Sequence, residues 1–176
     1  MRSAATTRRA ARPDARGQTP PGPRHLHLYT ADERRRRDLT PWTLVQGVLA
    51  PVQFLAFAVS LVLVVRYLAT GRGLDAANVS VVVKTGALYA IMVTGALWEK
   101  AVFGRYLFAR AFFWEDAVSM LVIALHTAYV VALLADRLTP AGRLVLALVA
   151  YAAYVVNATQ FVLKLRAARR GGPRLA

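Results

Sequence analysis

Among the residues that could do chemistry, the strongest candidates are two neighbouring acidic residues, Glu115 and Asp116. They end the string Phe-Phe-Trp-Glu-Asp at residues 112–116, directly before an apolar run. Neighbouring carboxyl groups at a membrane edge repel each other as anions and can keep one proton between them near neutral pH. A protonated carboxyl group is what a general acid requires. The alternative interpretation is structural, since acidic residues at the start of a helix are stabilised by its dipole.

His126 is the next candidate, because it lies near the middle of the apolar run that follows Asp116. In a helix, Glu115, Ser119 and His126 share one face. Glu115 and His126 lie about 16 Å apart along such a helix, so they cannot both touch one small reacting group. They could bracket one large flat ligand, with the imidazole near its centre and a carboxylate at its rim. Equally, a histidine at this depth can serve only as an interhelical hydrogen-bonding group.

Five other polar residues lie within or beside apolar runs. Glu99 and Lys100 follow such a run, where they are either part of a site or anchors at the membrane interface. Lys84 lies near the start of the same run, and we expect its side chain to reach back to the nearer membrane surface. Asn157 and Gln160, one helical turn apart, are either packing contacts between helices or polar contacts for a ligand.

The elements that must position these groups are membrane helices. Of the 176 residues 57% are hydrophobic, which is too apolar for an ordinary soluble domain. Four runs have the ~20-residue length that crosses ~30 Å of hydrocarbon. They cover residues 44–65, 79–98, 117–135 and 144–163. We therefore predict an all-α bundle of four transmembrane helices within residues 39–166. Pro51 should kink the first helix, and Gln53 could help to satisfy the backbone groups freed there.

The distribution of Lys and Arg predicts the orientation of this bundle. Ten arginines in residues 1–38, three basic residues in the connection 99–116 and five after residue 163 lie on one side, against four on the other. Because cytoplasmic segments are enriched in Lys and Arg, we expect both termini and the 99–116 connection to be cytoplasmic. We also expect residues 1–38 to be a largely disordered tail and residues 167–176 a short basic one.

Charge and cysteine content exclude several classes of function. The net charge of +14 comes from the chain ends and the connections, not from one amphipathic face, which argues against nucleic-acid binding. The chain has no cysteine, so disulfides, thiolate metal sites and cysteine nucleophiles are excluded. Only one histidine lies in any predicted span, so a bis-histidine haem site is excluded as well.

Seven strings along the chain carry a family resemblance. They are Leu-Tyr-Thr-Ala-Asp-Glu-Arg at 28–34, Pro-Trp-Thr-Leu-Val-Gln at 41–46, Arg-Tyr-Leu-Ala-Thr-Gly at 66–71, Val-Lys-Thr at 83–85, Thr-Gly-Ala-Leu-Trp-Glu-Lys at 94–100, Phe-Phe-Trp-Glu-Asp at 112–116 and Leu-His-Thr-Ala-Tyr at 125–129. In this order they resemble the 3-vinyl bacteriochlorophyllide hydratases of phototrophic bacteria. The resemblance covers residue 28 to about residue 166.

The resemblance implies a hydro-lyase of bacteriochlorophyll biosynthesis. Such an enzyme adds water across the C3-vinyl group of chlorophyllide a, or of a close bacteriochlorin relative, and leaves a 1-hydroxyethyl group. It implies no redox cofactor and no metal of the protein's own, because the magnesium belongs to the substrate. It also implies a multi-pass protein of the bacterial inner membrane, cytoplasmic or intracytoplasmic, in contact with lipid and with other enzymes of the pathway as candidate partners.

Within that activity, chemistry and position suggest a role for each candidate residue. Hydration of a vinyl group needs an acid that protonates the terminal carbon and a base that takes a proton from the attacking water. We expect Glu115 or Asp116 to be the acid and Glu99 the second carboxylate and water base. We expect His126 either to ligate the substrate's magnesium or to hydrogen-bond a ring substituent. The remaining ligand contacts are expected from Trp98, Trp114 and Phe113 stacking on the ring, Lys100, Arg105 or Arg110 holding its propionate, and Asn157 and Gln160 meeting its polar groups.

Two further functions stay open on the sequence alone. One is a non-catalytic pigment carrier or assembly protein, in which Glu99, Glu115 and Asp116 would tolerate neutral replacement. The other is a small transporter or channel subunit, in which Lys84, His126 and Asn157 would line a path. The predicted spans show neither the inverted repeat nor the pair of broken helices that transporters use, so the transporter is the less favoured of the two.

Overall fold

The computed structural model describes residues 28–170 and is built only of helices in that part of the chain. The elements are α1 (Ala31–Leu39), α2 (Pro41–Thr70), α3 (Leu74–Phe103), α4 (Phe113–Leu134) and α5 (Pro140–Arg170). α2 to α5 are long and apolar enough to cross a membrane. The predicted all-α fold with four membrane helices is therefore confirmed. The cytoplasmic placement of the termini stays a prediction.

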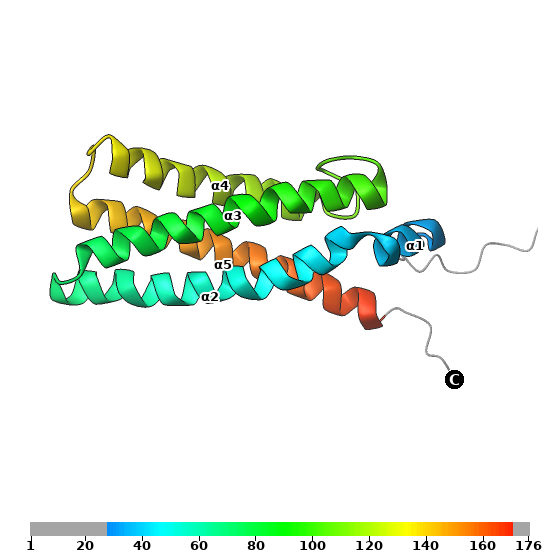
Figure 1. The fold of residues 1–176 in the computed structure, drawn as a ribbon, viewed down its shortest axis with the longest axis horizontal. Helices are drawn as coiled ribbons and strands as arrows, with labels where there is room; N and C mark the ends of the chain where they lie inside the picture. The colour runs from blue at the N-terminus through cyan, green and yellow to red at the C-terminus, as the bar shows by residue number, and fades with distance from the viewer. Residues whose placement is uncertain (1–27, 171–176) are drawn as a thin grey trace, which may run out of the picture.

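The four long helices form an elongated bundle of two antiparallel hairpins (Figure 1). α2 packs along α3, and α4 packs along α5, while contacts between the two hairpins are sparser. The connections at residues 71–73 and 135–139 lie at one end, which we call the far end. α1, the α3–α4 connection at residues 104–112 and the last turns of α5 lie at the opposite end, which we call the site end.

Glycines end two of the helices, and the sequence predicts one of these ends, because Gly71 and Gly73 break the first connection between apolar runs. Gly71 closes α2 at φ 69°, and its N–H donates to the carbonyl of Tyr67 over 2.7 Å. Gly104 closes α3 at φ 78°, and its N–H donates to the carbonyl of Lys100 over 3.0 Å. Both positions need a left-handed backbone, which glycine adopts without a side-chain penalty. The helices run past the predicted spans because polar residues at their ends continue the helical hydrogen bonding.

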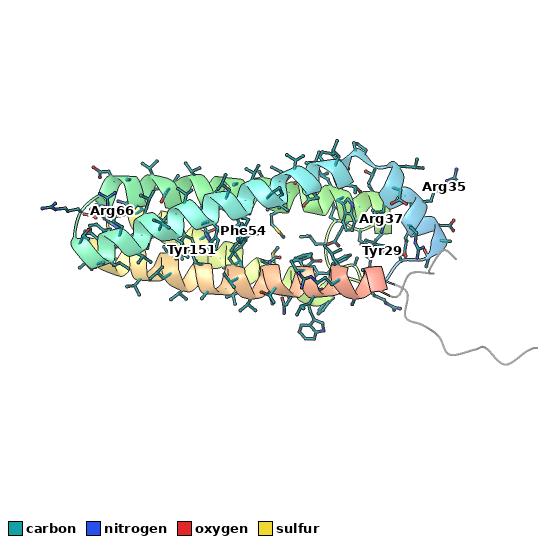
Figure 2. The ribbon with its side chains drawn as sticks, turned by 90° about the horizontal axis from the view of Figure 1, so that it is seen from below. Tyr29, Arg35, Arg37, Phe54, Arg66 and Tyr151 are labelled. Carbon is teal, nitrogen blue, oxygen red and sulfur yellow. The ribbon has the colours of Figure 1, made fainter. Side chains whose placement is uncertain are left out.

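The two hairpins meet in an aromatic core. Phe57 of α2 packs against Tyr151 and Tyr154 of α5, with ring centroids 5.4 Å and 5.0 Å away. Tyr151 lies in the interior of the bundle in Figure 2, whereas Arg66 projects outward at the far end. Many large apolar side chains on these helices are exposed, which is what a lipid-facing surface requires.

α1 is an element that the sequence prediction missed, because its residues were assigned to a largely disordered tail. Thr30 and Glu33 form a capping box at its start, with Glu33 N–H donating to Thr30 Oγ1 and Thr30 N–H donating to the Glu33 carboxylate. Tyr29 anchors the helix by packing on Phe103 and Phe112. Burial raises the pKa of the Tyr29 hydroxyl and keeps it neutral. Residues 1–27 and 171–176, also predicted to be tails, lie outside the described residues.

Candidate active site

The α3–α4 connection brings Glu99 and Asp116 together at the site end. Asp116 accepts a hydrogen bond from Phe108 N–H over 2.7 Å, and Glu99 accepts one from Ala109 N–H over 3.2 Å. Two consecutive backbone amides therefore hold the two carboxyl groups. Phe108 has φ 59°, an unusual value for a residue with a side chain, so the turn that presents these amides is strained.

The two carboxyl groups form a buried pair. Glu99 is 5% exposed and Asp116 is 4% exposed. The amides that hold them belong to consecutive residues, so the two carboxyl groups lie beside each other at one turn. Neighbouring carboxyl groups in a buried site favour the sharing of one proton, because both cannot easily be anions there. The pair thus provides a proton donor and a proton acceptor side by side, which is the requirement of general acid–base chemistry.

Glu115, the third predicted carboxylate, has a different partner. It forms an ion pair with Lys164 of α5, and it is also buried. Lys164 lies 5.0 Å from the centre of the Phe112 ring, which places its charge beside the carboxyl pair. Glu115 therefore pairs with an opposite charge on α5, whereas Asp116 lies beside Glu99 at the α3–α4 connection.

Lys164 is a site residue that sequence reasoning missed. It was counted only among the basic residues that set the orientation. The signal that could have found it is its spacing from Asn157 and Gln160, since positions seven and four residues earlier share one face of a helix. Asn157 lies on that face in the structure, and its Nδ2 donates to Ser119 Oγ of α4 over 2.8 Å.

The predicted aromatic contacts divide into two groups. Trp98 lies in the aromatic cluster that covers the site end, 5.7 Å from Phe112, and its indole N–H donates to Thr43 Oγ1 over 3.0 Å. Phe113 and Trp114 point away from the bundle, with 46% and 71% of their surface exposed. Of the three predicted aromatic contacts, only Trp98 is therefore part of the aromatic cluster at the site end.

The predicted cationic contacts lie at the rim of the site end. Lys100 is exposed, and its ammonium donates to the carbonyl of Gly104 over 3.1 Å while lying over the Tyr106 ring. Arg105 and Arg110 are exposed on the α3–α4 connection. All three are exposed on or directly before the connection that holds the carboxyl pair, where they can meet a negatively charged group of a ligand.

The structure contradicts the expected position of Lys84 and gives His126 a partner. Lys84 does not reach the membrane surface: it is 0% exposed, and Nζ lies 2.6 Å from His126 Nε2. His126 Nδ1 lies 2.7 Å from the carbonyl of Val122, which accepts its proton, so Nε2 is the acceptor for Lys84. The Lys84 ammonium also lies 4.2 Å from the centre of the Tyr154 ring. The lysine stays buried because an imidazole lone pair and an aromatic face replace water around it.

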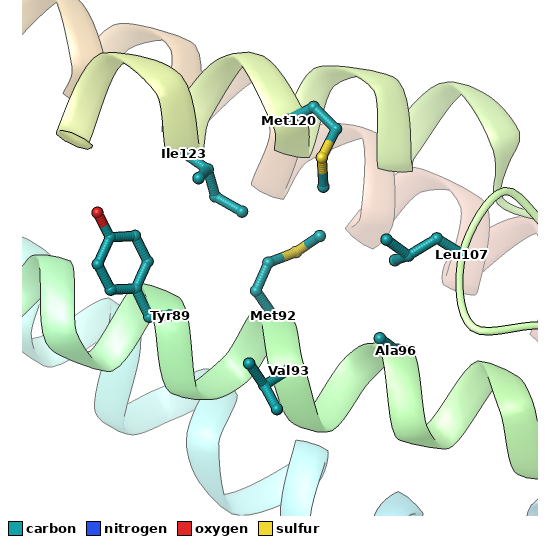
Figure 3. A pocket seen from close by; sticks show the side chains of 7 residues that line it. All are labelled: Tyr89, Met92, Val93, Ala96, Leu107, Met120 and Ile123. Carbon is teal, nitrogen blue, oxygen red and sulfur yellow. The ribbon is translucent and has the colours of Figure 1, made fainter. Parts of the chain in front are cut away.

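An apolar pocket opens between α3 and α4 next to the carboxyl pair (Figure 3). Its volume is about 270 Å³, and its walls carry Tyr89, Met92, Val93, Ala96, Leu107, Met120 and Ile123. Ala96 lies three residues before Glu99, Met120 lies four residues after Asp116, and Leu107 directly precedes Phe108. On α3 and on α4 the nearest lining residue is therefore about one helical turn from a carboxyl group of the pair. The two methionines reach toward each other across it, and such flexible side chains adapt to different ligand shapes.

These features define a multi-helix membrane protein with a buried pair of carboxyl groups and an apolar pocket between two of its helices. Comparison with known proteins then gives the family. Residues 29–167 match the model of the 2-vinyl bacteriochlorophyllide hydratase family, and the chain belongs to that family.

Two curated relatives support the assignment. The 2-vinyl bacteriochlorophyllide hydratase of Rhodobacter capsulatus is 62% identical over 151 residues, which cover 86% of this chain and 88% of the relative. The protein of the same name from Cereibacter sphaeroides is 61% identical over 152 residues, which cover 86% of this chain and 94% of the relative. No solved structure matches the chain significantly. The predicted family is confirmed.

Proposed function

We propose that this chain is a hydro-lyase that adds water to the vinyl group of a bacteriochlorophyllide in bacteriochlorophyll biosynthesis. The observation that carries the proposal is the buried Glu99–Asp116 pair at the end of an apolar pocket, in a chain of the 2-vinyl bacteriochlorophyllide hydratase family. The locant 2 of the family name and the locant 3 of the sequence analysis denote the same ring carbon in two numbering schemes for the macrocycle.

The mechanism uses the shared proton of the pair. The protonated carboxyl group of Glu99 or Asp116 gives its proton to the terminal vinyl carbon, and the π electrons of the double bond form the new C–H bond. The cation is then on the carbon next to the ring, where conjugation spreads the charge. Water adds its oxygen to this carbon, and the other carboxylate takes the released proton. The pair ends with one proton, as it began, so it is ready for another turnover.

The neighbouring residues complete the proposed site. The apolar pocket holds the vinyl-bearing edge of the ring, and Trp98 stacks beside it. Lys100, Arg105 and Arg110 hold the propionate at the rim. His126 as a ligand of the substrate's magnesium stays a prediction, and it requires Nε2 to exchange Lys84 for the metal. No cofactor enters the proposal, since the carboxyl pair supplies both proton transfers.

The distribution of Lys and Arg and the position of the pocket support the proposed membrane location. With the site end on the cytoplasmic side of a bacterial inner membrane, the carboxyl pair lies near the surface at which water-soluble partners arrive. The pocket opens sideways between α3 and α4, so the pigment can enter from the bilayer. Other enzymes of the pathway can pass the pigment on through the lipid or by direct contact.

The first test is incubation of the detergent-purified protein with chlorophyllide a in water enriched in ¹⁸O, followed by mass spectrometry of the pigment. We expect a gain of one labelled water. Glu99→Gln and Asp116→Asn should each lower kcat by at least about 100-fold, because each removes one half of the acid–base pair. Asp32→Asn, which changes an exposed carboxylate on α1, is the matched control and should retain activity.

Two results would contradict the proposal. Pigment that co-purifies with the protein but returns unchanged would favour the carrier function. Full activity of both Glu99→Gln and Asp116→Asn would show that the pair does not supply the protons, even if the activity itself were present.

A further inference from the structure

Three amide side chains inside the bundle carry polar atoms that bond to no protein group within the described residues. They are Oε1 and Nε2 of Gln53, Oδ1 of Asn157 and Oε1 of Gln160. Gln53 is 2% exposed and Asn157 is 9% exposed. This also corrects the expectation that Gln53 satisfies the backbone around Pro51. Unpaired polar atoms in an apolar interior are costly, so they indicate a bound polar ligand.

Gln53 and Asn157 lie at the same level of the bundle. The rings of Phe57 on α2 and Tyr154 on α5 are in contact, with centroids 5.0 Å apart. Gln53 precedes Phe57 by one turn, and Asn157 follows Tyr154 by one turn. Because α2 and α5 run in opposite directions, both amides are displaced from this contact toward the site end. The unpaired atoms of the two helices therefore belong to one polar region.

This polar region leads to the carboxyl groups. Asn157 Nδ2 donates to Ser119 Oγ, and Ser119 lies one turn from Asp116 on α4. Gln160 follows Asn157 on α5 and precedes Lys164, the partner of Glu115, by one turn. One helical turn spans about 5.4 Å, which one or two water molecules can bridge.

The chemistry of the two reactants decides between the candidate ligands. A magnesium-bearing macrocycle offers hydrogen-bond acceptors at its periphery but no ring N–H donor, and its vinyl group is apolar. The unpaired oxygen atoms of Asn157, Gln160 and Gln53 need donors, while Gln53 Nε2 needs an acceptor. Water meets both needs, and hydration consumes water.

We propose that Gln53, Asn157 and Gln160 bind the water that the reaction consumes and pass it to the carboxyl pair. This inference rests on the proposed function for the fate of the water, although not for its binding. It separates the entry of the two reactants: pigment through the apolar pocket between α3 and α4, and water through the polar region between α2, α4 and α5.

Hydroxyl-radical footprinting of the purified full-length protein, without pigment, tests the binding of water. Radicals form from water inside the protein and oxidise neighbouring aromatic rings. We expect oxidation of Phe57 and Tyr154 despite their burial, at 8% and 9% exposure. Gln53→Met and Asn157→Leu should lower oxidation of Tyr154 by about five-fold, because an apolar replacement removes the polar partners that hold water.

The matched control is Gln46→Met. Gln46 lies on the same helix as Gln53, but its Nε2 donates to Thr94 Oγ1 over 2.7 Å, so it needs no water. Its replacement should leave oxidation of Tyr154 unchanged. Asn157→Ser, which keeps a polar atom in a smaller side chain, should restore the labelling that Asn157→Leu loses, and it serves if the leucine variant fails to fold. Unlabelled Phe57 and Tyr154 in the folded wild-type protein would overturn the proposal.

Kinetics test the link between this water and the reaction. Gln53→Met and Asn157→Leu should each lower kcat about ten-fold and leave KM for the pigment unchanged, because they affect only the other reactant. A raised KM with unchanged kcat would overturn the proposal, since the amides would then contact the pigment. Footprinting needs no turnover, so failure of the proposed catalytic pair and failure of the water site give different results.

Discussion

At the scale of residues, the least expected finding is a lysine that stays in the interior. Lys84 bonds to His126 and lies against Tyr154, with no exposed surface. Lys84→Leu should lower the free energy of unfolding by about 2–3 kcal/mol, because it leaves the buried His126 Nε2 unpaired. Lys100→Leu, at an exposed position on the same helix, is the control and should change it by less than about 0.5 kcal/mol. Unfolding midpoints in detergent would measure the stability of both variants. Equal losses of stability would contradict a stabilising role of the Lys84–His126 contact.

At the scale of elements, the α3–α4 connection is what converts two separate carboxylates into a pair. The connection begins at Gly104, whose positive φ is strained for any residue that carries a side chain. Gly104→Ala should cost about 1 kcal/mol of stability and lower activity, because the strained turn shifts the amides of Phe108 and Ala109. Gly86→Ala in the middle of α3, where an added methyl group meets open space, is the control. This variant should keep both the stability and the activity of the wild-type protein. Activity assays beside thermal unfolding would test this. An unchanged kcat in a destabilised Gly104→Ala protein would contradict the link.

At the scale of the whole molecule, the orientation in the membrane stays the main prediction to test. The chain has no cysteine, so single cysteines can report it directly. In intact cells a membrane-impermeant maleimide should label Arg72→Cys at the far end, because we expect that end to face the periplasm. Arg105→Cys at the site end should react only after the cells are opened. The opposite pattern of labelling would show that the distribution of Lys and Arg does not set the topology of this protein.

The sequence predicted those parts of the fold that depend on composition and periodicity. The four apolar runs fixed the number of long helices, and the glycines near residue 71 marked where α2 ends. Spacing on one helix also placed Asp116 and Glu115 correctly at the start of α4. What could not be predicted were the partners on other helices. Chemistry led us to expect Glu99 in one site with Glu115 or Asp116, but the sequence does not indicate which of the two joins it. It also does not indicate that Glu115 joins Lys164 or that Lys84 joins His126, because these pairs depend on how α4 packs against α5 and against α3.

The pocket between α3 and α4 has a consequence for how the protein must be assayed. A ligand that enters from the hydrocarbon is concentrated there by partitioning, so the quantity that controls binding is its mole fraction in the lipid or detergent, not its amount per volume of buffer. In the proposed mechanism, the carboxyl pair would join a solute of the bilayer to water from outside it, as a phase-transfer catalyst does. Adding empty micelles at constant pigment should slow the reaction by surface dilution, with no change in the protein itself.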